Sequence, residues 1–396
     1  MLRTVQNTGE RCPGFTGAIV FRRPLDADGY TRHLSFCTGA AMLHVDALLG
    51  YAAVGYCAWR LLAAAAAAAS GAPHRFPPVP KGVQPPPGRV DVLHRFFETS
   101  GGLALYVRKW LPRFDCAPRG VLFLLHGLGE HGDRYDHVGR ALAKQGFAVF
   151  TVDHQGHGRS DGERMYAGDV QDLSKDFMEF VQHVLNGPKP GSSNAAVVDV
   201  ELEAHANVDW SKLPRFALGH SMGGVLVLEL VELSMQQGLG WNGIIVSSAP
   251  FWSVPGGGVP GFLGVLAKLL PRLHLPGFEF TKLGNDYDVY KRWSRDALMP
   301  QHGSTLRLMY SLLREGDRFA QSDNTLAKTF PAPLYMLHGE KDSLTFPQGT
   351  VNFYNACTQK DKTINIVPNA VHEVLNLEGY EKVLKDIVDW LVARLH

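Results

Sequence analysis

The pattern of hydrophobic residues beyond residue 90 predicts strands and helices in alternation. Short apolar runs, typical of strands buried on both faces, occupy residues 121–125, 147–152, 216–218, 243–247, 333–337 and 363–367. Apolar residues at helical spacing occupy residues 135–145, 173–185, 225–233 and 380–395. Residues 90–97 and 103–110 read as two further strands, joined by a Thr-Ser-Gly-Gly turn. This order predicts an α/β fold with a mostly parallel central sheet flanked by helices.

Two stretches interrupt this alternation. Residues 251–330 show little strand pattern and contain several Pro and Gly residues, so we expect a mostly helical cap inserted after the strand at 243–247. Residues 189–213 are polar and irregular, which is typical of a surface insertion. The core would then comprise residues 90–250 and 331–396, with its functional loops at the carboxyl ends of the strands.

The first 89 residues differ from the rest. Residues 47–69 are mostly apolar and long enough to span a bilayer, but Arg60 lies near their middle, at a cost of roughly 2.5–3.5 kcal/mol. A membrane anchor, an interfacial helix and an extension without fixed structure all remain open for this segment. Residues 74–89 are rich in proline, as in an extended linker, so we place the domain boundary at residue 89.

Composition excludes some classes of protein. A hydrophobic fraction of 45% is enough for a large core, and a net charge of +1 gives no sign of nucleic-acid binding. The five Cys residues are scattered, without the spacing of metal ligands or of a disulfide framework. Their arrangement favours a reducing compartment.

A serine stands where a strand is predicted to turn into a helix. Ser221 lies in G-H-S-M-G, after the strand at 216–218 and before the helix at 225–233. The short motif G-x-S-x-G also occurs by chance in glycine-rich turns. Its place between a strand and a helix is nevertheless that of a nucleophile elbow, in which glycines let the two elements approach closely. We therefore interpret Ser221 as a candidate nucleophile.

A serine nucleophile requires a base and an orienting acid, which follow it in the order Asp or Glu, then His, in folds of this kind. His372 follows the last predicted strand and is the candidate base. Asp342 follows the preceding strand and is the candidate acid, with Glu340 as its rival. Two backbone amides would bind the oxyanion: that of Met222, after the nucleophile, and that of Leu128 in H-G-L-G-E-H.

Longer motifs resemble one family. H-G-L-G-E-H-G-D-R-Y, D-H-Q-G-H-G-R-S-D-G-E-R-M and G-H-S-M-G-G, followed in order by H-G-E-K-D and A-V-H-E, resemble the monoacylglycerol lipases. These enzymes are serine α/β-hydrolases of the serine aminopeptidase S33 type, a group that includes lysophospholipases. The resemblance runs from about residue 90 to the C-terminus. It implies the α/β-hydrolase fold, the triad of Ser221, Asp342 and His372, and oxyanion amides at Leu128 and Met222.

The resemblance also implies how the substrate is bound. Glu130 and Arg134 would line the polar end that receives the glycerol head, and Tyr290 falls near a cap tyrosine with a similar role. The implied reaction is hydrolysis of monoacylglycerol to glycerol and fatty acid through an acyl-enzyme, without a cofactor.

A second group of residues has the residue types of a metal site. It consists of Asp153, His154, His157 and Asp161. The family match implies a rigid structural loop here instead, so we predict no metal.

The implied substrate is a lipid. The apolar cap stretch at 259–275 would cover the acyl tunnel and touch a lipid surface, with plain cap packing as its alternative. Together with the segment at 47–69, it predicts a membrane-associated, intracellular protein. A lysophospholipase, another carboxylesterase or an acyltransferase would use the same triad. The non-enzyme alternative, an inactive, membrane-tethered hydrolase-like binding protein, would be favoured by loss of a triad member, and none is lost.

Overall fold

The computed structural model describes residues 95–113, 116–187, 207–251, 259–277, 291, 293–300 and 302–395. Outside these residues lie the segment at 47–69, the proline-rich linker, most of the insertion at 189–213, and Tyr290. Within the described ranges, none of the helices combines the length and the apolar character needed to cross a bilayer.

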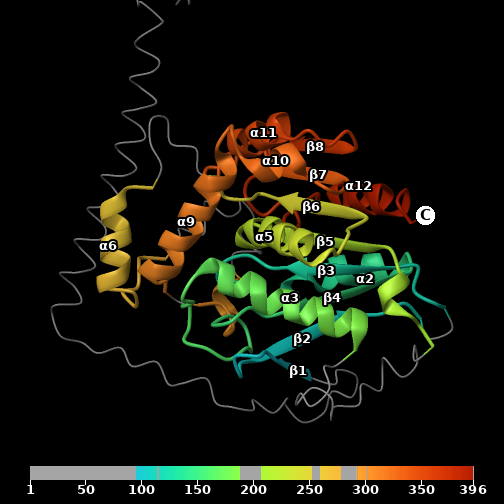
Figure 1. Cartoon of the computed structure of the whole chain (residues 1–396), viewed down its shortest axis with the longest axis horizontal. Helices are drawn as coiled ribbons and strands as arrows, with labels where there is room; N and C mark the ends of the chain where they lie inside the picture. Colours follow the sequence, from blue (N-terminus) through green and yellow to red (C-terminus); the bar gives the residue numbers. More distant parts are fainter. Residues whose placement is uncertain are drawn as a thin grey trace, which may run out of the picture. The chain divides into compact units, whose positions relative to one another are not determined.

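A sheet of eight strands forms the centre of the fold (Figure 1). In chain order the strands are β1 (Arg95–Glu98), β2 (Ala104–Trp110), β3 (Gly120–Leu125), β4 (Phe147–Val152), β5 (Arg215–His220), β6 (Gly243–Ser247), β7 (Leu334–Gly339) and β8 (Lys362–Val367). Their spatial order is β1-β2-β4-β3-β5-β6-β7-β8. The β1–β2 and β2–β4 pairs are antiparallel, and β3 to β8 are mutually parallel. The predicted α/β fold with a mostly parallel sheet is confirmed.

Helices cover both faces of the sheet (Figure 1). They are α2 (Asp136–Lys144), α3 (Val170–Asn186), α5 (Met222–Gln237), α6 (Gly261–Leu269), α9 (Leu306–Ala320), α10 (Thr325–Thr329), α11 (Pro347–Ala356) and α12 (Tyr380–Val392), with the 3-10 helices η1 (Gly132–Tyr135) and η3 (Trp210–Lys212). Alternate side chains of β3 point to opposite faces. Phe123 joins the apolar cluster of α3 and α5, whereas Leu122 and Leu124 join that of α2 and α12.

The helices differ from the sequence prediction at a few points. Helix α3 begins three residues before the predicted 173, because Asp169 and Asp172 form a reciprocal capping box at its first turn. Helix α11, which begins with Pro347, was not predicted, since its apolar spacing is weak. Between β6 and β7, α9 packs on α3 and α5, and α6 packs on α9.

We expect Phe123→Ala to lower the free energy of unfolding by about 3–5 kcal/mol, the usual cost of truncating a buried aromatic residue. The Phe123 side chain is fully buried, and its ring contacts those of Phe177, Phe180 and Trp241. Denaturant titration of the full chain would measure the loss. The matched control is Phe262→Ala, because Phe262 is 50% exposed. Equal losses in the two variants would contradict the packing described here.

Candidate active site

Ser221 lies in a strained turn between β5 and α5. Its backbone has φ 53° and ψ −120°, a conformation that residues other than glycine rarely adopt. A Cβ atom added at Gly219 would lie 2.0 Å from the carbonyl oxygen of Gly223. A Cβ added at Gly223 would lie 2.1 Å from the carbonyl oxygen of Leu125 in β3. Glycine alone fits at both positions, so strand and helix approach as closely as a nucleophile elbow requires.

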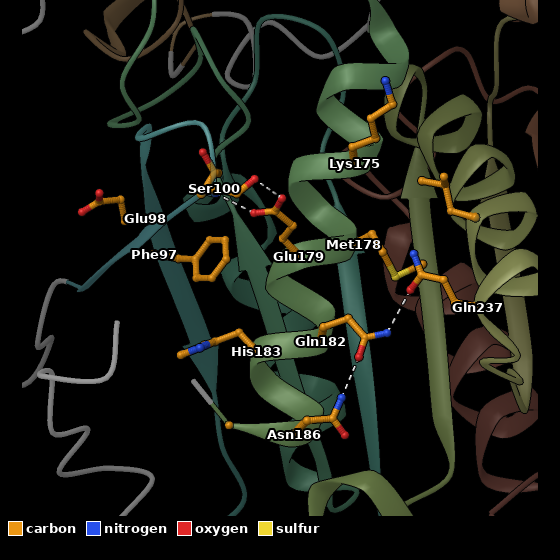
Figure 2. A pocket seen from close by; sticks show the side chains of 13 residues that line it. Phe97, Glu98, Ser100, Lys175, Met178, Glu179, Gln182, His183, Asn186 and Gln237 are labelled. Atoms are coloured by element: carbon orange, nitrogen blue, oxygen red, sulfur yellow. Dashed lines mark hydrogen bonds between the residues drawn. The ribbon is translucent and has the colours of Figure 1, made fainter. Parts of the chain in front are cut away.

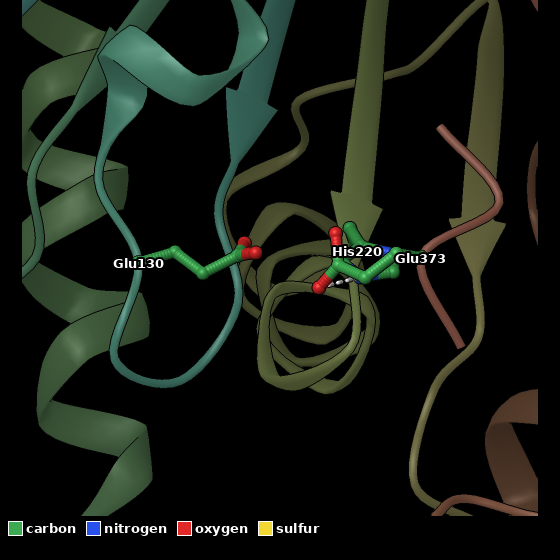
Figure 3. A group of neighbouring side chains, drawn as sticks. All are labelled: Glu130, His220 and Glu373. Carbon is green, nitrogen blue, oxygen red and sulfur yellow. Dashed lines mark ion pairs between the residues drawn. The ribbon is translucent and has the colours of Figure 1, made fainter. Parts of the chain in front are cut away.

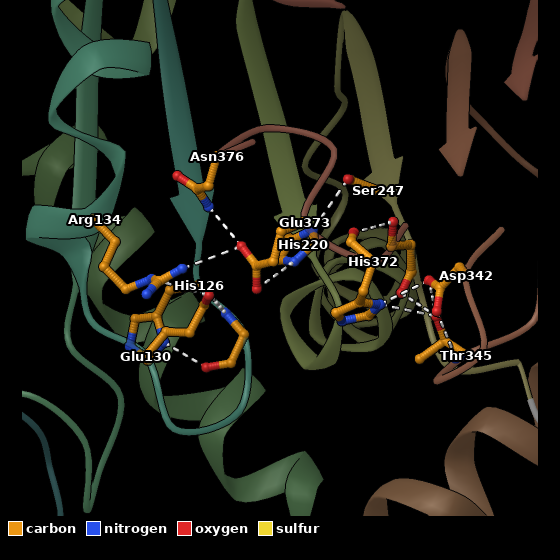
Figure 4. Close-up of polar contacts among 12 residues, drawn as sticks. His126, Glu130, Arg134, His220, Ser247, Asp342, Thr345, His372, Glu373 and Asn376 are labelled. Atoms are coloured by element: carbon orange, nitrogen blue, oxygen red, sulfur yellow. Dashed lines mark hydrogen bonds and ion pairs between the residues drawn. The ribbon is translucent and has the colours of Figure 1, made fainter. Parts of the chain in front are cut away.

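The candidate base and acid are in direct contact. The Nδ1 atom of His372, after β8, lies 2.7 Å from Oδ2 of Asp342, after β7 (Figure 4). Burial alone would raise the pKa of Asp342, but hydrogen bonds from His338 and His372 outweigh burial and hold that pKa well below its usual range. Asp342 therefore stays ionised and can stabilise a positive charge on His372. Glu340, the rival acid, is exposed and accepts a hydrogen bond from the amide of Asn369 instead.

Further groups hold the Asp342 carboxylate in place. Its Oδ1 atom accepts hydrogen bonds from the amides of Leu344 at 2.8 Å and Thr345 at 3.1 Å. Its Oδ2 atom accepts from the Thr345 hydroxyl at 2.7 Å, and Nε2 of His338 lies 3.0 Å away. Neither Thr345 nor His338 was assigned a role from the sequence. The signal available for Thr345 was its place in the turn that begins with Asp342.

The loop that carries the candidate oxyanion amide lies against the nucleophile. A Cβ added at Gly127 would come within 3.2 Å of the Ser221 Cβ and within 2.9 Å of a Glu130 carboxylate oxygen. Leu128 follows directly in this loop, after β3. Met222 is the first residue of α5, so its N–H has no acceptor inside the helix. Both predicted amides therefore belong to backbone segments that meet at Ser221.

The structure places Glu130 and Arg134 in the interior. Their side chains are 5% and 6% exposed, and Nε of Arg134 lies 3.1 Å from Oε1 of Glu130. The other Glu130 oxygen accepts hydrogen bonds from the Gly127 amide at 2.8 Å and the Tyr135 hydroxyl at 2.7 Å. The Arg134 guanidinium also stacks on Trp293, 4.2 Å from the ring centre. This burial favours a role in supporting the loop over the direct contact with a glycerol head that the resemblance implies.

Two more buried residues, His220 and Glu373, lie next to Glu130 and Arg134. Ligand atoms of Glu130, His220 and Glu373 lie within 4.8 Å of one another, close enough to suit a metal ion (Figure 3). Arg134 already contacts both carboxylates, however, with Nη2 3.1 Å from Oε2 of Glu373. The guanidinium thus supplies the positive charge that the carboxylates need. His220 and Glu373 were not singled out from the sequence, although each directly neighbours a predicted triad residue.

The histidine-rich loop after β4 is tied to the backbone around it. The Asp153 carboxylate accepts hydrogen bonds from the amides of Gly132 at 2.7 Å and Arg159 at 2.8 Å. Burial lowers the pKa of His154 to about 3 and that of His157 to about 4, so both imidazoles are neutral near pH 7. These contacts are those of a rigid loop, as the resemblance implies.

A cavity of about 770 Å³ lies between the β1–β2 turn and α3 (Figure 2). Its polar lining includes Ser100, Glu179, Gln182 and Asn186. The Ser100 hydroxyl and amide both bond the Glu179 carboxylate. None of the predicted site residues lines this cavity, so it is separate from the site at Ser221.

The comparisons with known proteins agree with this architecture. The family model for serine aminopeptidase, S33, matches residues 116–378. The chain is 30% identical over 302 residues to a monoacylglycerol lipase of Mycolicibacterium smegmatis, covering 76% of this chain and 96% of that protein. It is 28% identical over 303 residues to a monoglyceride lipase of Rattus norvegicus, covering 74% and 88%.

A solved structure gives the same result in three dimensions. The crystal structure of a monoacylglycerol lipase from Paleococcus ferrophilus superposes with a TM-score of 0.57 at 27% identity. The match covers 73% of this chain and 99% of that one. The family resemblance expected from the motifs is therefore confirmed, and the chain belongs to the serine aminopeptidase S33 family of α/β-hydrolases.

Proposed function

We propose that the protein is a carboxylic ester hydrolase that cleaves monoacylglycerol into glycerol and a fatty acid. The observation that carries the proposal is the 2.7 Å contact between His372 and Asp342, which come from two different loops at the sheet edge where Ser221 lies. The substrate class is taken from relatives that share most of this chain's length, the monoacylglycerol lipases of Mycolicibacterium smegmatis and Rattus norvegicus.

The proposed mechanism has two stages. In the first, His372 takes the proton of Ser221 while the serine oxygen attacks the ester carbonyl, and the amides of Leu128 and Met222 bind the oxyanion. The bond to glycerol then breaks, His372 protonates the departing oxygen, and the acyl group stays on Ser221. In the second, His372 deprotonates a water that attacks the acyl carbon. The fatty acid leaves, and Ser221 recovers its proton. Asp342 holds the imidazole in the required tautomer throughout.

The buried charges beside the candidate site favour an uncharged head group. Arg134 is paired with both Glu130 and Glu373, so its charge is already neutralised. Without touching the substrate, these two carboxylates would repel a phosphate in the site, whereas they would not repel the hydroxyl groups of glycerol. We therefore prefer a monoacylglycerol to a lysophospholipid. Tyr290 is retained as a proposed contact from the cap.

Helix α6 supports contact with a lipid surface. Its apolar residues Phe262, Val265 and Leu269 are 50%, 58% and 71% exposed, and Leu270 beside them is 46% exposed. Large apolar side chains gathered on one exposed helix mark an interaction surface. Because the proposed substrate resides in membranes, we propose that α6 docks on the lipid surface from which the substrate is taken.

Ser221→Ala is expected to lower kcat for monoacylglycerol by about 10⁴- to 10⁶-fold, as loss of the nucleophile does in other enzymes with this triad. Release of fatty acid by the purified full chain measures the effect. The control is Ser174→Ala, which removes a buried hydroxyl on α3 that has no hydrogen-bond partner among the described residues. Wild-type turnover in the Ser221 variant would show that another group is the nucleophile.

A comparison of substrates tests the head-group preference. We expect the full chain to hydrolyse a monoacylglycerol at a higher kcat/KM than a lysophospholipid or a diacylglycerol with the same acyl chain, because the positive charge of Arg134 is already paired with two carboxylates. Adding an alcohol acceptor to the same assay distinguishes hydrolysis from acyl transfer. Faster turnover of the lysophospholipid would overturn the proposed substrate, and acyl transfer as the main product route would make the protein an acyltransferase.

The double variant Phe262→Ser and Leu269→Ser is expected to weaken binding to phosphatidylcholine vesicles by about tenfold or more, because each apolar side chain contributes about 1.5–3 kcal/mol when fully buried. Hydrolysis of a water-soluble short-chain ester should stay unchanged. Cosedimentation with vesicles measures binding. Met235→Ser, at an apolar residue of α5 that is 44% exposed, is the control. Undiminished vesicle binding of the double variant would exclude α6 as the docking surface.

A further inference from the structure

Glu373 occupies a special position among the loops of the site. It directly follows His372, yet its carboxylate is buried and points away from Asp342 (Figure 4). Oε2 accepts a hydrogen bond from Asn376 of the same loop at 2.8 Å and lies 3.1 Å from Nη2 of Arg134. Oε1 lies 3.6 Å from Nε2 of His220, the residue before the nucleophile. One carboxylate therefore contacts the segments that carry the base and the nucleophile.

The same contacts continue to the oxyanion loop. The Arg134 guanidinium contacts both Glu373 and Glu130, and its Nε atom lies 3.1 Å from the Glu130 carboxylate. Glu130 in turn accepts the hydrogen bond of the Gly127 amide at 2.8 Å. Gly127 is the residue whose added Cβ would touch Ser221. Glu373 is therefore linked, through Arg134 and Glu130, to the backbone that would position the amide of Leu128.

The charges around Glu373 show that it is ionised in place. Burial alone would raise its pKa, but Arg134 and His220 outweigh burial and hold the pKa well below its usual range. For His220, burial alone would lower the pKa, and the Glu373 carboxylate raises it. The other titratable groups that face this carboxylate are Glu130, Tyr135 and His372. A negative charge is therefore fixed between the His372 loop and the segment that precedes Ser221.

We propose that Glu373 is a positioning residue for the reaction, holding the His372 loop, the nucleophile elbow at His220 and the oxyanion loop through Arg134 in one fixed arrangement. The proposal rests on the proposed roles of Ser221 and His372. Glu373 acts through its neighbours and does not touch the substrate.

Glu373→Gln preserves the size of the side chain but removes its charge. We expect kcat to fall by about 10- to 100-fold with little change in KM, because small misplacements of reacting groups cost this much. A role in stability alone would leave the kcat of the folded enzyme unchanged. Glu373→Asp, which keeps the charge on a shorter stem, should restore part of kcat.

The matched control is Glu229→Gln. Glu229 is also buried and also paired with an arginine, Arg318, but it lies two turns along α5 from Ser221, and its charged partners among the described residues, Glu315 and Arg318, are on α9. It should keep the wild-type kcat. Thermal unfolding of each variant identifies any that does not fold. If Glu373→Gln is unfolded, Arg134→Lys tests the same anchor, because a lysine cannot bridge two carboxylates as a guanidinium does.

Labelling with a fluorophosphonate separates this proposal from the one it rests on. In the wild type, the probe should attach to Ser221, as found by mass spectrometry of the labelled peptide. Attachment elsewhere, or none, would overturn the proposed mechanism and with it this inference. Attachment at Ser221 together with wild-type kcat in folded Glu373→Gln, or in folded Arg134→Lys, would overturn the positioning role alone.

Discussion

The close approach of α5 to the ends of β3 and β5 is the constraint on which the rest of the site depends. Side chains at Gly219 or Gly223 would collide with backbone atoms 2.0–2.1 Å away, so the elbow could not form with any other residue there. The strained backbone of Ser221 costs on the order of 1–3 kcal/mol. The apolar residues of α5 offset that cost, because the helix is buried along its first ten residues, from Met222 to Val231.

The buried charges around Arg134 are better explained by the loop positions that they fix than by a gain in the stability of the fold. Taking ions out of water costs several kcal/mol each, and their mutual attraction regains this only when the contacts are well formed. Apolar residues of similar size would make the interior at least as stable. What they could not do is connect residues 127, 134 and 373 by directional contacts. A guanidinium with two carboxylate partners fixes both distance and orientation, and the loops it joins are those that must meet at Ser221.

The sequence allowed the sheet and the candidate triad to be predicted because their signals are local. Ser221 follows β5 and Asp342 follows β7, which are both buried strands, and His372 follows β8, which is half-buried. The sequence favoured Asp342 over Glu340 as the acid. Both lie in one loop, and its backbone turn brings Asp342 to His372. The contact of Arg134 with Glu373 joins residues 239 positions apart, so no local pattern indicates it. Tyr290 and the segment at 47–69 fall outside the described residues and stay predictions.

Asp342 contacts two imidazoles, yet the surroundings suit only one of them to act as the base. His338 is held at both nitrogens, by Thr350 at 2.7 Å and by Asp342 at 3.0 Å, so it has no nitrogen free to move a proton. Burial lowers the pKa of His338 further than Asp342 raises it, which keeps this ring neutral and a hydrogen-bond donor. His372 uses Nδ1 for the same carboxylate, which leaves its Nε2 for proton transfer. One histidine thus helps to hold the acid ionised while the other carries the proton.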